Sequence, residues 1–156
     1  MATDILLFEC TGMKNGEKFP VANTGRGQDT SPAFLIKNLS PRAKTLAVTL
    51  EDTKHPLFKN FTHWLIWNIP ASEKIDGKIL GGKMVPGLGN ARQGIGYGMY
   101  RYAGPKPPKG RQHSYRFTVY ALDREIDLRF PHTKSHFLRK AKENIIQQGS
   151  IVCEFE

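Results

Sequence analysis

The chain has 156 residues, a formal net charge of +9 and a sequence pI near 9.7. Hydrophobic residues make up 39% and charged residues 24%, a balance that is ordinary for a folded chain and excludes intrinsic disorder. Its apolar runs all fall well short of the roughly 18 residues that a membrane-spanning helix needs. We therefore expect a single domain over residues 1–156, without a transmembrane segment.

The N-terminal residues predict a cytoplasmic location. The segment from Met1 to Glu9 has no basic cluster, and an acid precedes a very short apolar run. This pattern is not that of a secretory signal peptide. In a cytoplasmic protein we expect Cys10 and Cys153 to be free thiols packed in strands. Two isolated cysteines suit neither a disulfide framework nor a zinc site.

Short apolar runs bounded by turn signals predict a mostly β protein. The expected strands are residues 5–10, 33–38, 45–50, 62–69, 114–122 and 150–155. Between Ser114 and Leu122, apolar and polar residues alternate, which predicts a strand buried on one face. The glycine-rich residues 71–98 are expected to form a long irregular loop.

One helix is predicted near the C-terminus, at about 133–148. Thr133 or Ser135 can cap its start, and Gly149 can end it. Apolar residues recur at helical spacing on one face, namely Phe137, Leu138, Ala141, Ile145 and Ile146. Many short strands with one late helix indicate a β-sheet or sandwich with a helix on its flank.

Two stretches of the same design carry the candidate functional residues. In one, Asp52 ends a strand, and a proline-bearing loop leads to His63 at the start of the next strand. In the other, the proline-rich loop 104–108 leads to His113 and Tyr115. Strand ends and loops on a rigid sheet are common places for binding groups. We therefore predict that the two stretches meet at one site.

These residue types suit an anion. A carboxylate close to a histidine fixes its tautomer and favours its charged form, so that the imidazole can donate to phosphate or carboxylate oxygens. Backbone N–H groups of the proline loop can add further donors. The predicted ligand-binding residues are Asp52, His63, Gly104, Pro105, Lys106, Pro107, His113 and Tyr115. We predict no cofactor, no metal ligand and no catalytic residue.

Three alternatives stay open at this point. Asp52, His63 and His113 also describe a facial triad for a metal, although a basic neighbourhood opposes a cation. The same residues could serve as acid–base groups of a hydrolase or lyase. Residues 77–116 contain eight lysines and arginines and no acid, which fits nucleic-acid binding with steeply salt-dependent affinity.

Several ordered motifs resemble one known family. The D-T-K-H-P at 52–56 stands where that family has D-P-D-A-P, and H-W-L-I-W-N-I-P at 63–70 resembles its H-W-V-x-x-N-I-P. Y-A-G-P-K-P-P at 102–108 resembles Y-x-G-P-C-P-P, and H-S-Y at 113–115 and Y-A-L-D at 120–123 resemble H-R-Y and Y-A-L-D. The chain thus resembles the phosphatidylethanolamine-binding protein family, which includes the Raf kinase inhibitor proteins. It is most similar to the bacterial and archaeal branch.

The resemblance implies a fold and a function. It implies a large antiparallel β-sheet packed on a smaller sheet, with one C-terminal helix and short peripheral helices. It also implies a pocket for phosphate-like anions at the residues predicted above. Members of the family are mostly non-enzymatic proteins that bind or regulate kinases, proteases or other partners, and some resemble homodimers. We therefore expect a non-enzymatic protein that binds a small phosphorylated or carboxylated anion.

Two departures from the family pattern add positive charge. Lys54 stands at the second acid of D-P-D-A-P, and Lys106 stands at the cysteine of G-P-C-P-P. An opposite charge within a few ångströms contributes on the order of 1–4 kcal/mol at intermediate dielectric. Two hypotheses follow. Either the pocket prefers more highly charged anions than a typical relative does, or Lys54 pairs with Asp52 and closes it.

Overall fold

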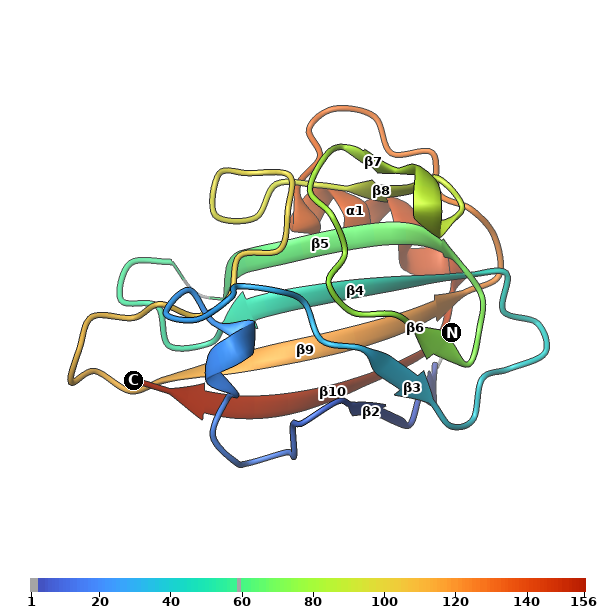
Figure 1. Cartoon of the computed structure of the whole chain (residues 1–156). Coiled ribbons are helices and arrows are strands. Elements are labelled where there is room, and N and C mark those ends of the chain that lie inside the picture. The colour runs from blue at the N-terminus through green and yellow to red at the C-terminus, as the bar shows by residue number, and fades with distance from the viewer. Residues whose placement is uncertain (1–2, 59) are drawn as a thin grey trace.

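The computed structural model describes residues 3–58 and 60–156, and over this range the chain is mostly β (Figure 1). Met1 and Ala2, part of the segment that predicted the location, lie outside the described residues. The strands are β1 (Asp4–Ile5), β2 (Phe8–Cys10), β3 (Phe34–Ile36), β4 (Thr45–Asp52), β5 (Phe61–Pro70), β6 (Lys74–Ile75), β7 (Met84–Val85), β8 (Ala91–Gln93), β9 (His113–Leu122) and β10 (Ile145–Phe155). The helical elements are α1 (Lys134–Ala141) and the short 3₁₀ helices η1 (Val21–Asn23), η2 (Pro86–Leu88) and η3 (Lys142–Asn144).

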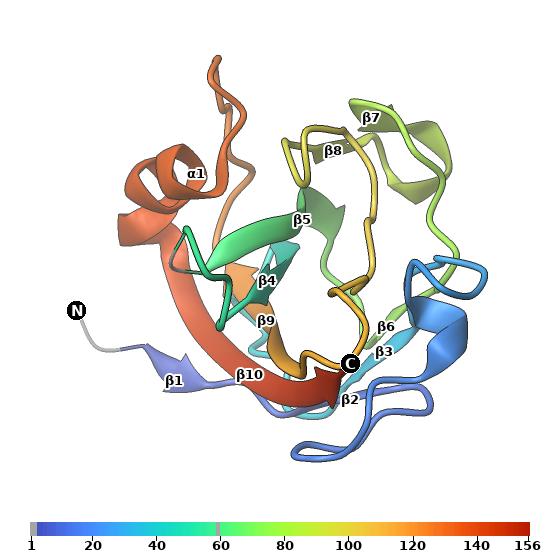
Figure 2. The ribbon, with the colours of Figure 1, turned by 90° about the vertical axis from the view of Figure 1, so that its left-hand side faces the viewer.

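The strands form a curled sandwich of a larger and a smaller sheet. Within the described residues the larger sheet has the order β1-β10-β9-β4-β5-β8-β7, and the smaller one has the order β2-β3-β6. All pairs are antiparallel except β1, which runs parallel to β10. Figure 2 shows β10 sweeping from beside α1 toward the smaller sheet. The predicted fold class is confirmed, with β1 making the larger sheet mixed.

The first part of the core lies between the two sheets. Because side chains alternate along a strand, every second residue of β4, β5 and β9 points toward the smaller sheet. Phe117 of β9 meets Phe34 of β3 edge to face, with ring centroids 5.4 Å apart. Leu50 and Trp64 join the same cluster and are fully buried. This packing fixes the larger sheet rigidly against the smaller one.

The second part of the core lies under α1, on the opposite face of the larger sheet. Trp67, Tyr120 and Phe137 pack together there. The prediction that β9 is buried on one face only was wrong, because α1 covers the face that alternation had assigned to solvent. The polar Thr118 is accommodated on this face by a 2.9 Å hydrogen bond between its hydroxyl and that of Ser150.

The C-terminal helix is shorter than predicted. α1 ends at Ala141, and Ile145 and Ile146 already belong to β10. Their spacing fits a helix, but pairing with β9 supplies more backbone hydrogen bonds and overrides the local pattern. Gly149 is not a helix stop. It pairs with Val119 of β9. A Cβ there would stand 1.9 Å from the carbonyl oxygen of Leu6, so the close approach of the Leu6 backbone to β10 requires glycine.

Two other expectations are corrected. The strand predicted at 5–10 splits, so that β1 joins the larger sheet and β2 the smaller one. Asn38 stabilises the segment that connects β1 to β2. Its side-chain oxygen accepts from the Leu7 N–H, and its side-chain nitrogen donates to the Ile5 carbonyl. The region 71–98 is not wholly irregular, because it contributes β6, β7 and β8.

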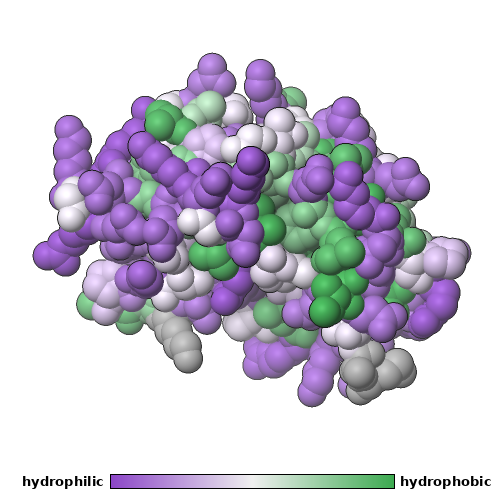
Figure 3. Space-filling view, turned by 90° about the horizontal axis from the view of Figure 1, so that it is seen from below, coloured by the Kyte–Doolittle hydropathy of each residue, from purple (hydrophilic) through white to green (hydrophobic). Residues whose placement is uncertain are grey.

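The outer side of the smaller sheet is open to solvent. The face in Figure 3 is mostly hydrophilic and carries an apolar patch. Ile5, Leu7 and Leu35, which lie in or beside β1, β2 and β3, are among the exposed large apolar residues. Cys10 and Cys153 are free and buried on the inner side, as predicted, and burial raises the pKa of both thiols. Among the described residues no helix has the length and apolarity required to cross a membrane.

Candidate functional site

Three strand ends meet at one edge of the larger sheet. β4 lies between β5 and β9 and runs antiparallel to both, so its C-terminal end lies beside their N-terminal ends. Asp52 pairs with Phe61 of β5 on one side and with Tyr115 of β9 on the other. The two stretches predicted from the sequence are therefore brought together by the strand order.

A β-bulge turns His63 toward this edge. Leu50 pairs with Trp64 and Glu51 with Thr62, which leaves His63 as an extra residue between the two pairs. Strict alternation would put His63 on the face of Leu65 and Trp67, beneath α1. The bulge instead aims the ring toward Tyr115, with ring centroids 5.4 Å apart. Sequence periodicity alone assigns this side chain to the wrong face.

The centre of the site is a carboxylate–imidazole pair. Asp52 Oδ2 lies 2.7 Å from His113 Nδ1, and both side chains are largely buried. The other carboxylate oxygen accepts the backbone N–H of Lys54 at 2.9 Å. Because Asp52 can only accept when ionised, His113 carries its proton on Nδ1 and turns Nε2 toward the site. This pairing agrees with the reasoning from sequence that a carboxylate fixes the histidine tautomer.

His63 is held in a different way. Its Nδ1 lies 2.9 Å from the carbonyl oxygen of Ala103, an acceptor, so Nδ1 carries the proton. Burial lowers the pKa of His63, and this effect outweighs the opposing influence of the Ala103 carbonyl, Asp52 and the Gly104 carbonyl. A neutral His63 therefore presents an unprotonated Nε2, which is a hydrogen-bond acceptor.

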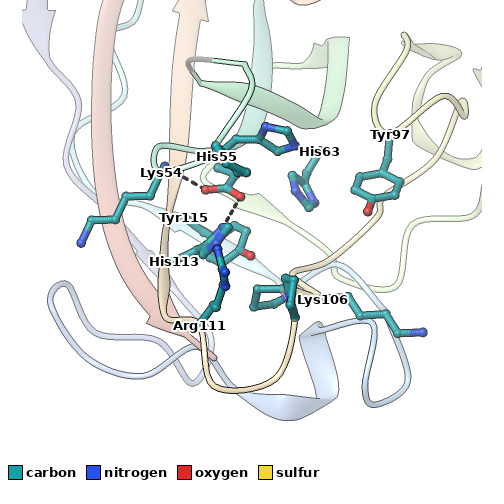
Figure 4. Close-up of a pocket in the computed structure, with 12 residues that line it drawn as sticks. Lys54, His55, His63, Tyr97, Lys106, Arg111, His113 and Tyr115 are labelled. Atoms are coloured by element: carbon teal, nitrogen blue, oxygen red, sulfur yellow. Dashed lines mark hydrogen bonds and ion pairs between the residues drawn. The ribbon is translucent and has the colours of Figure 1, made fainter.

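The described residues around these groups enclose a cavity of about 330 Å³, which we call the strand-end cavity (Figure 4). Its lining is Asp52, Lys54, His55, Pro56, His63, Tyr97, Lys106, Pro107, Pro108, Arg111, His113 and Tyr115. Six of the eight predicted residues thus line one cavity. Neither tryptophan lines it. Trp64 and Trp67 are buried in the core, and their indole N–H groups donate to Gln93 and to the Ile126 carbonyl, respectively.

Gly104 and Pro105 form the back of the proline loop and do not line the cavity. The Gly104 N–H donates to Asp29 Oδ1 at 2.6 Å, and the Pro105 carbonyl accepts from the Gly25 N–H at 2.9 Å. The predicted use of the Gly104 amide as an anion donor is therefore not seen, since that amide already has a partner. The carboxylate of Asp29, which sequence reasoning missed, anchors the loop.

The two added lysines lie at the rim. Figure 4 shows the Lys54 and Lys106 side chains extending away from the Asp52–His113 pair. No ion pair joins Lys54 to Asp52 within the described residues, so the hypothesis of a closed pocket does not match this geometry. Arg111 behaves differently, because its side chain rises toward His113. No acid pairs with it in the described part of the chain.

Sequence reasoning also missed an aromatic side of the cavity. His55 stacks on Phe61 with centroids 4.6 Å apart, and Tyr97 lies 5.1 Å from the His63 ring. Tyr97 has φ +52°, a left-handed backbone that is uncommon for a tyrosine. Two signals in the sequence could have indicated these cavity residues. His55 lies inside D-T-K-H-P, and Arg111 lies two residues before His113. The position of Tyr97 in a glycine-rich loop gave none.

The alternatives for this site can be compared with the geometry. Among the described residues no group of three or more His, Cys, Asp or Glu side chains is arranged to hold a metal ion. In the basic segment 77–116, two of the eight lysines and arginines are paired with acids, Arg101 with Asp29 and Arg116 with Glu51. Its cationic residues at the cavity are Lys106 and Arg111.

The fold and the site define a β-sandwich class in which a polar cavity opens where the strand ends of the larger sheet meet. Residues 10–156 match the family described as phosphatidylethanolamine-binding protein, and the chain belongs to that family. The resemblance inferred from the motifs is confirmed.

Relatives and solved structures agree with this assignment. A UPF0098 protein of Pyrococcus abyssi is 35% identical over 144 residues, which are 91% of this chain and 80% of that protein. The UPF0098 protein YbhB of Escherichia coli is 31% identical over 121 residues, or 72% of this chain and 75% of that protein. A phosphatidylethanolamine-binding protein homolog from Chlamydia trachomatis superposes with a TM-score of 0.84 at 22% identity, covering 99% of both chains. E. coli YbcL, described as a member of the mammalian PEBP family, gives 0.83 at 25% identity, covering 97% of this chain and 98% of that one.

Proposed function

We propose that this protein is a non-enzymatic binding protein whose strand-end cavity takes a small anion with a phosphoryl or carboxylate group. The observation that carries the proposal is the Asp52–His113 pair at 2.7 Å beside Arg111. The family name supports it, since it describes binding of a lipid whose head group contains a phosphate.

The charges at the cavity suit an anion of low charge. Arg111 supplies a guanidinium, and the Asp52–His113 pair contributes a donor from His113 when the imidazole is protonated. The Asp52 carboxylate is occupied on both oxygens, by His113 and by the Lys54 N–H, which limits its repulsion of a bound anion. Proline residues 107 and 108 stiffen one wall, so less entropy is lost on binding.

The test is titration calorimetry with inorganic phosphate, phosphorylethanolamine and citrate. Arg111→Ala should weaken phosphate binding on the order of tenfold, because it removes a charge-assisted donor that is partly screened by solvent. Lys54→Ala is the matched control. It removes the same charge from a side chain that extends away, and it should change the dissociation constant by less than about twofold. Absence of salt-sensitive binding of any of these anions to the wild-type protein would refute the proposal.

One observation favours a second candidate, an acid–base enzyme. A histidine held by a carboxylate is the arrangement of a general base, and His113 has that partner. Against it, no serine, threonine or cysteine among the described residues lines the cavity, so a nucleophile of these three types is not available there. Turnover of a phosphate ester or a lactone that is lost in His113→Gln would support the enzyme, and binding without turnover would oppose it.

A further inference from the structure

Three histidines line the strand-end cavity, and each Nδ1 has a different kind of partner. His55 Nδ1 accepts the backbone N–H groups of Leu57 and Phe58, both at 3.1 Å. His63 Nδ1 donates to the Ala103 carbonyl, and His113 Nδ1 donates to the Asp52 carboxylate. Since each partner determines where the proton sits, the outward Nε2 atoms differ in kind. His55 offers an N–H, whereas neutral His63 offers a lone pair.

The lone pair on His63 Nε2 constrains the ligand. Among the described residues no protein group donates to this atom, and it is not one of the buried atoms left without a partner, so it faces the cavity. An oxygen without a proton placed against it would bring two lone pairs together. A ligand oxygen that carries a proton would instead form a hydrogen bond. An acceptor built into a site discriminates strongly against a ligand that lacks the donor.

The charges at the cavity also favour a ligand oxygen that carries a proton. Arg111 is the guanidinium of the cavity, and the His113 imidazole is paired with Asp52. Lys54 and Lys106 extend away. A dianion would therefore meet one cation and a nearby carboxylate, whereas a monoanion with one P–O–H group would match both the guanidinium and the acceptor.

We infer that the strand-end cavity selects phosphoryl groups that carry a P–O–H, as in dihydrogen phosphate and singly protonated monoesters, over phosphodiesters and sulfate. His63 is the residue that sets this specificity. Arg111 binds the unprotonated oxygens, together with His113 when its imidazole is protonated. The inference rests on the proposed function and narrows its ligand class. It separates a free phosphate monoester from the phosphodiester of an intact phospholipid.

The decisive comparison uses two ligands of equal charge. At about pH 5.5, below the second pKa of a phosphate monoester near 6, methyl phosphate is mostly a monoanion with a P–O–H. Dimethyl phosphate is also a monoanion but has no such proton. We expect methyl phosphate to bind the wild-type protein at least about tenfold more tightly, as a missing hydrogen bond to a partly open site implies. Inorganic phosphate should likewise exceed sulfate, although sulfate has the larger charge.

Two variants assign the effect to His63. His63→Phe keeps a ring but removes the acceptor, so the ratio of methyl phosphate to dimethyl phosphate affinity should fall to within about threefold of unity. His55→Phe makes the same change at another ring of the cavity, one whose outward atom is a donor, and it should preserve the ratio. Circular dichroism and a thermal melt establish that each variant is folded. The wild-type comparison stands by itself if His63→Phe does not fold.

The outcomes separate the inference from the function on which it rests. Equal binding of methyl and dimethyl phosphate, or sulfate binding more tightly than phosphate, would overturn the inference and leave the anion site intact. No binding of any of the four anions would overturn both. A preference for methyl phosphate that survives in His63→Phe would show that His63 is not the residue that sets the specificity.

Discussion

Glu51 joins three parts of the molecule through a nearly buried carboxylate. Its Oε1 accepts from both Arg116 Nε, at 2.8 Å, and the Arg116 Nη2 group, and its Oε2 contacts Lys134 Nζ. Lys134 is the first residue of α1 and also lies 3.4 Å from the Asn60 carbonyl, in the loop beside the strand-end cavity. We predict that Glu51→Gln destabilises the protein and loosens this loop.

The magnitude follows from the burial of the partners. Removing one member of a buried ion pair typically costs about 3–5 kcal/mol, because the other charge is left buried without compensation. The Lys134 side chain is 15% exposed, so the cost of leaving it unpaired is near the lower end of that range. The Arg116 side chain is 34% exposed, and the loss of its ion pair adds at most about 1 kcal/mol. We expect a loss of about 3–4 kcal/mol, which for a chain of this length lowers the melting temperature by roughly 6–16 °C.

Urea denaturation and a thermal melt measure the effect. Glu143→Gln is the matched control, since Glu143 is exposed and has no ion pair among the described residues, and it should change stability by less than about 0.5 kcal/mol. Adding Lys134→Met to Glu51→Gln removes the unpaired ammonium and should recover about 1 kcal/mol or more. A loss below about 1 kcal/mol in Glu51→Gln, or no recovery in the double variant, would refute the reasoning.

Two further predictions concern the cavity. Because burial lowers the pKa of His63 below the unfolded value of about 6.5, the folded protein binds this proton more weakly than the unfolded chain. The contribution of neutral His63 to stability should be present above pH 6.5 and be lost as the pH falls below it, and His63→Phe should flatten that part of a denaturation profile; an unchanged slope would contradict the assignment. Gly104→Ala should displace the proline loop, because its Cβ would stand 2.2 Å from the Asn23 carbonyl oxygen and 2.8 Å from Asp29 Oδ1. We expect loss of phosphate binding and a lower melting temperature, whereas Gly110→Ala, strained by its positive φ but with open space around it, should affect stability less and binding little.

The meeting of the two stretches that contain Asp52 and His113 could be predicted from the sequence because it depends on strand ends. Once β4, β5 and β9 are neighbours, antiparallel pairing leaves no other place for these residues. The face occupied by His63 could not be predicted, because a single extra residue between two backbone pairs reverses the alternation. No composition or spacing at Phe61–Trp64 indicates where the sheet inserts that residue.

Long-range contacts account for the other differences. Gly149 ends a helical pattern in the sequence, yet its role is to let the Leu6 carbonyl approach β10, a contact between the two ends of the chain. The sequence around Gly104 is typical of an anion-binding loop, but the Gly104 N–H donates to the side chain of Asp29, 75 residues earlier. At both positions the glycine indicates an unusual backbone environment, but the sequence does not indicate which distant residue contacts it.

The substitutions Lys54 and Lys106 show why counting charges along a motif overstates their effect. From the sequence, replacement of an acid and a cysteine by lysines adds positive charge beside Asp52. In the folded chain both ammonium groups extend on long side chains away from the Asp52–His113 pair, into solvent where salt screens them. The groups that face the cavity are instead Arg111 and the Nε2 atoms of His63 and His113. The hydrogen-bonding character of the two histidines is set by a backbone carbonyl and a carboxylate, respectively. We therefore expect ligand choice in this cavity to depend more on the hydrogen-bond partners behind the histidines than on the charges added at its rim.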